Sequence, residues 1–137
     1  MLLYRKKHWN GVDVSTGYQY FLEILLQQEK SAACKAFIQK HLEHIYISDF
    51  SLHSIGVITF RQHKSHLFRL LTQDLLPHIQ ALSLPVPLYP EFESLSSGLH
   101  LDFDDAYQYL LARQFHLTLV TLDKDFKHLT DINIQQP

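Results

Sequence analysis

Residues 101–126 hold five of the fourteen acidic residues in this chain, in two groups whose spacing favours metal chemistry. Asp102, Asp104 and Asp105 open a predicted helix, and Asp123 and Asp125 follow a predicted strand. Carboxylates from separate elements repel one another unless a cation neutralises them, and oxygen ligands suit Mg²⁺ or Mn²⁺. A cation held in this way can activate water against a phosphodiester. The stretch therefore predicts a candidate metal site.

The same carboxylates also have a purely structural interpretation. Asp102 stands where a helix N-cap is expected, and Asp105 where the reciprocal residue of a capping box is expected. Asp104 suits the first helical turn, where the helix dipole favours negative charge. Asp123 should emerge at the end of a buried strand, and Asp125 two residues later could cap a final turn. Spacing alone leaves both interpretations open.

The elements that must position these residues alternate between short strands and helices. Ser31 and Ser48 are the expected N-caps of the second and third helices. The expected helices cover residues 20–26, 31–44, 48 to about 58, 63–76, 91–97 (closed by Gly98) and 102–115. The expected strands cover residues 11–15, 45–47, 117–122 and 132–134, and the proline-rich residues 84–90 suit an edge strand or an extended link. This order predicts an α/β fold in which helices cover both faces of a short parallel sheet. Ligands bind such sheets beyond the C-terminal ends of the strands.

Composition indicates one globular domain. The chain has 137 residues, of which 46% are hydrophobic, with a net charge of −2, so no global basic field indicates nucleic acid. We expect a basic N-terminal arm at residues 1–10, either flexible or forming an added first strand, and a single domain at residues 11–137. Cys34 is the only cysteine, which excludes an intrachain disulfide. Without a recognisable signal sequence or membrane span, a cytoplasmic protein is expected.

Four segments resemble the PIN-domain family, which includes the toxin nucleases of toxin–antitoxin pairs. Leu101–Ala106 resembles the helix-opening Asp-Ala of the family, and Leu119–Phe126 resembles its strand ending in Thr-x-Asp-x-Asp-Phe. Tyr46–Gly56 and Tyr20–Leu26 resemble earlier family segments, so the likeness covers roughly residues 12–134. The resemblance implies a three-layer α/β/α sandwich and an Mg²⁺- or Mn²⁺-dependent ribonuclease that uses three or four carboxylates. It also implies an antitoxin-like protein partner and a homodimer.

Carried over residue by residue, the resemblance assigns catalysis and metal binding to Asp105 and Asp123, with Asp125 as a neighbouring ligand. Two family positions are not matched, because Ser15 stands at the place of the first-strand Asp and Ser54 at that of the helical Glu.

Nearby residues are weaker candidates for the missing ligands. Asp13 faces the same side of the first strand as Ser15, but it is set back by about 6.5 Å, the length of two strand residues. His53 lies beside Ser54, although a histidine on an apolar helix is more often structural. Arg61 and Lys64 are candidates for contacts with RNA phosphates, unless they simply form a solvated helix face.

Three hypotheses follow. The leading one is a PIN-like ribonuclease whose activity is weakened by the missing carboxylates. The second is an inactive PIN-like module that binds RNA or a partner protein, which the two unmatched positions favour. The third is a structural α/β domain whose carboxylates are helix caps.

Overall fold

The computed structural model describes residues 21, 24, 26–123 and 125–135. The expected arm at residues 1–10 and the expected first strand at residues 11–15 lie outside the described residues, and so do Asp13 and Ser15. Phe21 and Ile24 are helical, within the helix expected at residues 20–26.

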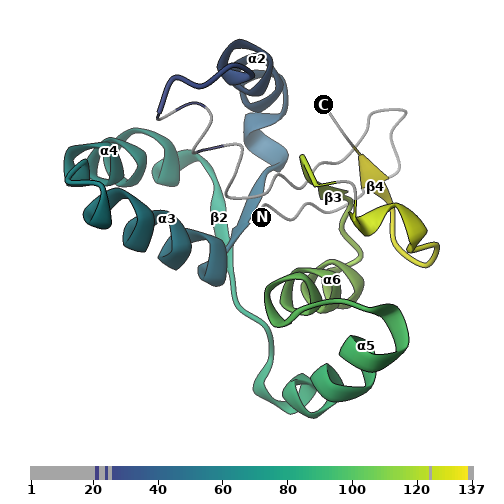
Figure 1. Ribbon diagram of the computed structural model, residues 1–137. Coiled ribbons are helices and arrows are strands. Elements are labelled where there is room, and N and C mark those ends of the chain that lie inside the picture. The colour runs from purple at the N-terminus through teal and green to yellow at the C-terminus, as the bar shows by residue number, and fades with distance from the viewer. Residues whose placement is uncertain (1–20, 22–23, 25, 124, 136–137) are drawn as a thin grey trace.

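The first half of the described chain runs from a helix through two strands that pair with each other. Figure 1 shows α3 and α4 side by side, with α2 above the strands. The elements in order are α2 (Ser31–His41), the 3₁₀ turn η1 (Leu42–His44), β1 (Tyr46–Ser48), α3 (Asp49–Arg61), α4 (Ser65–Leu70), the π-turn η2 (Leu71–Leu75), the 3₁₀ turn η3 (Leu76–His78) and β2 (Gln80–Leu82).

The second half places two helices against each other before the chain enters the last strands. Figure 1 shows α5 beside α6 at the lower end of the molecule. The elements are the 3₁₀ helix η4 (Val86–Glu91), α5 (Phe92–Leu99), α6 (Phe103–Phe115), β3 (Leu119–Val120), the 3₁₀ turn η5 (Asp125–His128) and β4 (Ile134–Gln135).

The strands are short and parallel, as the alternating pattern predicts. β1 pairs with β2, with Ile47 opposite Ala81, and β3 pairs with β4, with Leu119 opposite Ile134. Parallel strands need crossover connections. The helices α3 and α4 lie in the connection from β1 to β2, and the 3₁₀ turn η5 lies in the connection from β3 to β4. The α/β fold class with parallel strands is therefore confirmed.

Several local expectations are wrong. Ser31 is the first residue of α2, and its N-cap is Lys30, which makes no side-chain cap. Residues 84–90 form no strand, since η4 begins at Val86, whereas β2 at residues 80–82 was not expected. Gly98 lies inside α5, and the helix ends instead at His100, whose φ of 54° is left-handed. Asn and His tolerate this region better than most residues, so glycine is not required there.

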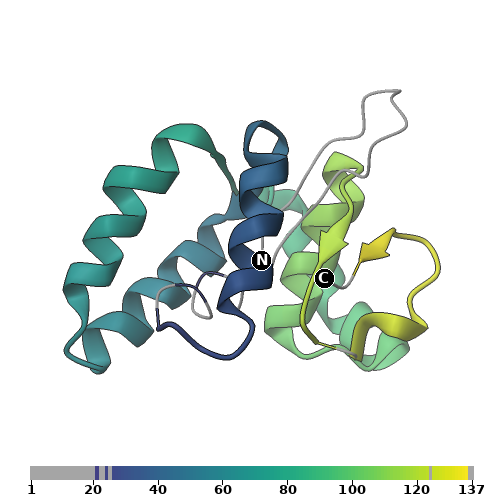
Figure 2. The same cartoon turned by 90° about the horizontal axis from the view of Figure 1, so that it is seen from above.

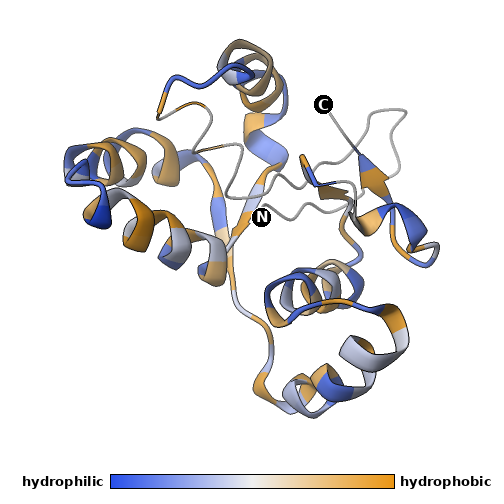
Figure 3. Ribbon diagram, in the orientation of Figure 1, coloured by the Kyte–Doolittle hydropathy of each residue, from blue (hydrophilic) through white to orange (hydrophobic). Residues whose placement is uncertain are grey.

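Two groups of buried side chains form the core. One surrounds α6 and β3 and includes Cys34 of α2, and the other joins α2, β1 and α3 around Ile38, Ile47 and Ile55. β3 lies at the hydrophobic end of the scale in Figure 3. Within the described residues, no helix is both long enough and apolar enough to cross a membrane.

The hydroxyl of Tyr107 joins three segments. Tyr107 is 3% exposed on α6, and its hydroxyl donates to Asp49 Oδ1 at 2.6 Å. The same oxygen accepts the backbone N–H of Leu84 at 2.9 Å. The phenol ring also packs on Phe50, with ring centroids 5.3 Å apart. The first turns of α3 and α6 and the link after β2 are therefore held together at one point.

A second polar group is buried between the same helices. Ser48 caps α3 by accepting the Ser51 backbone N–H at 2.9 Å, and the Ser48 hydroxyl donates to Ser51 Oγ at 2.9 Å. Gln108 of α6, only 2% exposed, reaches Ser51 Oγ through Nε2 at 3.4 Å. Among the described residues its Oε1 has no hydrogen-bond partner. A buried unpaired amide oxygen costs about 1–3 kcal/mol of stability.

We predict that the protein loses stability above about pH 10, the ordinary pKa of tyrosine. Burial raises the pKa of Tyr107, and its hydrogen bond to Asp49 adds to the rise. Burial and the bond to Asp131 raise the pKa of Tyr109. A raised folded-state pKa gives its full stabilisation below the unfolded pKa and loses it as pH rises toward the folded one. Urea unfolding at successive pH values should show this fall, with a shallower slope for Tyr107→Phe. An unchanged slope would contradict the assignment.

We also predict that Gln108→Met is neutral or stabilising by up to about 1 kcal/mol, because the change removes an unpaired buried oxygen at similar volume. Ser51 keeps its bond from Ser48. The matched control is Gln114→Met, at an exposed position of the same helix, which should change the free energy of unfolding by less than about 0.5 kcal/mol. Destabilisation of the Gln108 variant by more than about 1 kcal/mol would mean that the amide contributes net stability.

Candidate functional site

The first turn of α6 presents three carboxylates, and one of them fixes the backbone. Asp102 is the N-cap, and its Oδ1 accepts the Asp105 backbone N–H at 2.9 Å. Asp102 and Asp104 are exposed, whereas Asp105 is half-buried. Partial burial and the neighbouring Asp102 carboxylate raise the pKa of Asp104. The predicted cap is confirmed, and it holds the backbone that carries Asp105.

Asp123 follows β3 as the sequence predicts. Leu119 and Val120 are fully buried, and Thr121 is 1% exposed. The chain then reaches the surface at Asp123, which is half-buried. Its backbone N–H donates to Thr121 Oγ1 at 3.0 Å. A buried strand and a local hydrogen bond thus fix the position from which this carboxylate leaves the sheet.

Chain direction brings Asp105 and Asp123 to the same end of the molecule. α6 ends at His116, a left-handed residue with a φ of 54°, and the chain turns back into β3. Figure 2 shows α6 and β3 side by side and running in opposite directions. The start of α6 and the residues after β3 therefore lie at the same end. This is the end where the sequence predicts the site.

The start of α3 lies beside this end of the molecule. Two residues near it, Asp49 of α3 and Gln108 of α6, were not among the predicted site residues. The rings of Phe50 and Phe103 are 6.3 Å apart, so the first turns of α3 and α6 are neighbours. Asp49 accepts the Tyr107 hydroxyl, and Gln108 lies three residues after Asp105, one turn along the helix. The signal available in the sequence was a lone amide within a helix that is otherwise apolar from Ala106 to Ala112.

The remaining predicted site residues are dispersed. Ser54 is half-buried, and its hydroxyl donates to the Phe50 carbonyl at 2.9 Å, while His53 is exposed. Arg61, the last residue of α3, and Lys64, three residues beyond it, are both exposed. The 13-residue helix places Arg61 about 20 Å from Ser48. Asp125 is the first residue of η5, and its side chain lies outside the described part of the structure. Among the described residues, no three His, Cys, Asp or Glu side chains form a group that could hold a metal.

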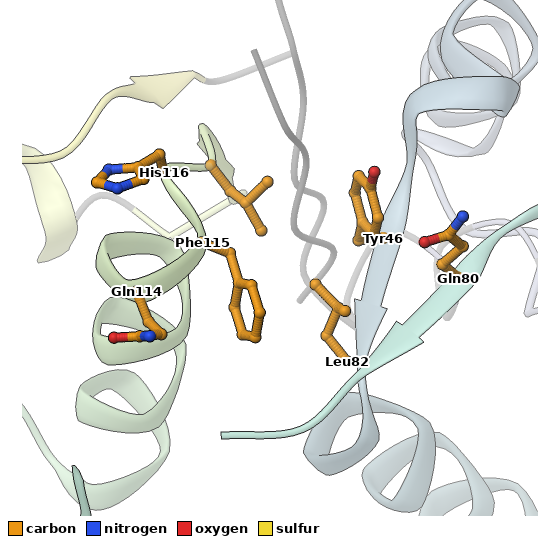
Figure 4. Close-up of a pocket in the computed structure, with 7 residues that line it drawn as sticks. Tyr46, Gln80, Leu82, Gln114, Phe115 and His116 are labelled. Carbon is orange, nitrogen blue, oxygen red and sulfur yellow. The ribbon is translucent and has the colours of Figure 1, made fainter. Parts of the chain in front are cut away.

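A pocket of about 300 Å³ lies away from these carboxylates. Figure 4 shows Tyr46, Gln80 and Leu82 of the β1–β2 pair on one side, and the last residues of α6 on the other. The pocket also touches His116, beyond the C-terminal end of α6, whereas Asp105 lies in the first turn of that helix. No described residue that lines it is acidic. The pocket is therefore not the predicted metal site.

Several solved structures share the fold of this chain. The chain resembles VapBC2 from Rickettsia felis bound to a DNA fragment from its promoter (TM-score 0.74, 13% identity, 90% of this chain and 97% of that chain). It also resembles FitAB bound to the IR36 DNA fragment (0.76, 18%, 90% and 94%). A third similar structure is FitAcB from Neisseria gonorrhoeae (0.67, 20%, 88% and 95%). At these low identities the TM-scores establish a shared fold and nothing more.

Family membership comes from the sequence itself. No curated protein matches the chain. The PIN domain family, however, matches residues 19–132, which is most of the 137-residue chain and includes both Asp105 and Asp123. The recurring fold and this match agree with the motifs at the start of α6 and the end of β3. The protein belongs to the PIN domain family.

Proposed function

We propose that the protein is a metal-dependent ribonuclease in which Asp105 and Asp123 hold Mg²⁺ or Mn²⁺. The observation that carries this proposal is their placement, on two adjacent elements of opposite direction, each with its backbone fixed by a local hydrogen bond. Both side chains are half-buried, which suits a carboxylate that must reach both the protein and a ligand.

The residues present fit such a cation. Both donors are carboxylate oxygens, which are the ligands that Mg²⁺ prefers, and Mg²⁺ commonly keeps several waters while using one or two carboxylates and substrate phosphates. Asp125 and Asp13 remain proposed supporting ligands. A cation bound there would lower the pKa of a water molecule that attacks the phosphodiester.

The chain contributes orientation and electrostatics to this reaction. The Asp102 cap and the Tyr107 hydrogen bonds fix the first two turns of α6, so Asp105 is held before substrate arrives. The positive end of the α6 dipole lies at this turn and attracts negatively charged groups. If Arg61 and Lys64 contact RNA, they do so away from the cleaved phosphate, at the far end of α3.

A second candidate function is an inactive module that binds RNA or a partner protein. The observation that favours it is Ser54, which stands at the place of the family's helical Glu and whose hydroxyl bonds to its own helix. Loss of this carboxylate lowers the negative charge available to a cation. Cleavage and metal binding separate the two candidates.

We further propose an antitoxin-like partner. The names VapBC2 and FitAB denote two-component assemblies with the same fold, and both were solved bound to DNA fragments. By analogy, this chain would act within a similar assembly, and a homodimer is part of the same proposal.

Substitution of either carboxylate should slow RNA cleavage. Removing a residue that only supports a metal ligand typically lowers activity about 10- to 100-fold. We therefore expect Asp105→Asn and Asp123→Asn each to lower the rate of cleavage with Mn²⁺ at least about tenfold. The matched control is Asp104→Asn, which neutralises an exposed carboxylate of the same turn and should retain activity. The assay uses purified protein and fluorescent single-stranded RNA, with EDTA to remove the metal.

Two results would decide against the proposal. Unchanged cleavage in both variants would remove Asp105 and Asp123 from the site. No cleavage by the parent protein, together with no shift of melting temperature on adding Mn²⁺, would favour the inactive module.

Restoring a carboxylate at position 54 should strengthen metal binding. We expect Ser54→Glu to bind Mn²⁺ severalfold more tightly than the parent, because a further charged oxygen ligand raises affinity for a hard cation. Ser54→Gln has the same length without the charge and serves as the control. Isothermal titration calorimetry measures both, and equal affinities for the two variants would place position 54 outside the reach of the cation.

A further inference from the structure

The turn between α3 and α4 is exposed along its whole length and presents an aromatic ring. Residues 60–66 are all exposed, and Phe60, at 62%, is the most exposed phenylalanine or tyrosine of the described residues. Its ring meets that of Phe68 in α4 edge to face, with centroids 6.2 Å apart and planes at 76°. An exposed ring held by a second helix is a preformed surface for stacking. We call residues 60–69 the α3–α4 tip, which lies at the left edge of the molecule in Figure 1.

The α3–α4 tip carries three cations without an acidic neighbour. Arg61, Lys64 and Arg69 are exposed, and residues 50–73 contain no Asp or Glu. Among the described residues, no carboxylate forms an ion pair with any of the three. Arg69 donates instead to the neutral amide of Gln73 at 3.3 Å. The positive charge of the tip is therefore not neutralised within the described part of the chain, and it attracts an anionic ligand.

Backbone hydrogen bonds fix the ring and the cations of the tip relative to one another. α3 is followed by His63, whose φ of 56° is left-handed and turns the chain into α4. The His63 N–H donates to the Phe60 carbonyl at 3.1 Å, and the Lys64 N–H donates to the Thr59 carbonyl at 2.8 Å. The backbone of Lys64 therefore lies against the turn that carries Phe60 and Arg61. A surface fixed in this way loses little conformational entropy when a ligand binds.

We propose that the α3–α4 tip binds single-stranded RNA, with Phe60 stacking on a base and Arg61 and Lys64 contacting the phosphates beside it. Sites for single strands combine cations that follow the backbone with aromatic rings on which bases stack. The charge of the tip favours an anionic ligand, and the exposed ring favours RNA over an acidic peptide, whose carboxylates would pair with the cations but leave the ring in water. The choice of RNA rests on the proposed ribonuclease function.

The position of the tip makes it an anchor for the strand and not a place of cleavage. The 13-residue helix α3 places the tip about 20 Å from its own start, which lies beside the proposed metal site. At the spacing of a stacked strand, about 3.4 Å per nucleotide, that distance corresponds to about six nucleotides. A longer RNA would be held at the tip while a phosphodiester farther along it reaches Asp105 and Asp123. This binding would not require the metal.

Fluorescence anisotropy in EDTA tests the tip separately from the metal site. The probes are a labelled twelve-nucleotide oligouridine and a labelled hepta-glutamate peptide. We expect Phe60→Ala to weaken oligouridine binding at least about fivefold, the lower end of the effect of removing one stacking ring, and Phe60→Trp to retain it. Arg61→Gln and Lys64→Gln should each flatten the dependence of log affinity on log salt by about 0.7, the value for one phosphate contact on a single strand.

Matched variants separate the tip from the rest of the surface. Tyr89→Ala removes an aromatic ring that is 42% exposed in η4, and Lys40→Gln removes an exposed cation from α2. Neither should change the oligouridine affinity or its salt dependence, and thermal melting confirms that each variant is folded. No binding of oligouridine in EDTA, or unchanged affinity in Phe60→Ala, would overturn the proposal. Hepta-glutamate that binds as tightly as oligouridine and depends on Arg61 and Lys64 would assign the tip to an acidic peptide instead.

Cleavage with Mn²⁺ distinguishes failure of this inference from failure of the proposed nuclease. Asp105→Asn and Asp123→Asn should bind oligouridine in EDTA no more weakly than the parent. In cleavage, Phe60→Ala should raise KM for the twelve-nucleotide strand about fivefold with kcat unchanged, and should leave cleavage of a tetranucleotide as it is, because that strand is too short to span both places. Binding at the tip without cleavage would refute the nuclease alone. Cleavage that no tip variant alters would refute the anchor alone.

Discussion

The buried hydroxyl of Tyr107 is the point on which the candidate site depends. It donates to Asp49 on α3 and accepts from Leu84 after β2, so it fixes two segments against α6 from a single atom. Removing this hydroxyl would leave the buried backbone N–H of Leu84 without its acceptor, at a cost of about 1–3 kcal/mol, whereas a typical hydrogen bond contributes about 0.5–1.5 kcal/mol net. Since Tyr107 lies two residues after Asp105, the same bonds hold the helical turn that carries this carboxylate.

Local signals explain what the sequence could predict. The cap at Asp102 and the apolar positions after it define α6 to within a residue, and the cap at Ser48 defines the start of α3. β2 carries no comparable signal, because its three residues become a strand only through pairing with β1. The end of α5 was placed wrongly because glycine is the usual terminating residue, whereas here His100 takes the left-handed conformation.

The same distinction between local and long-range signals applies to the residues of the candidate site. Asp105 and Asp123 could be found because each belongs to a local motif, and the turn at His116 accounts for their common end of the fold. Asp49 and Gln108 could not, because their partners lie 58 and 57 residues away in sequence. Gln108 also departs from the pattern of its helix, being a polar residue at a buried position, and this departure was the only local signal for it. Its contact with Ser51, and the lack of a partner for its Oε1 among the described residues, become visible only when the packing is known.

The distribution of charge bears on how the proposed nuclease would bind RNA. Among the described cations, Arg61 and Lys64 lie at the far end of α3, whereas the starts of α3 and α6 near the site carry carboxylates. A phosphodiester approaching this end meets repulsion unless a cation offsets it, so a bound metal would determine whether RNA binds as well as whether it is cleaved. The same negative field therefore makes nucleic-acid binding at this end of the molecule conditional on metal in the proposed function.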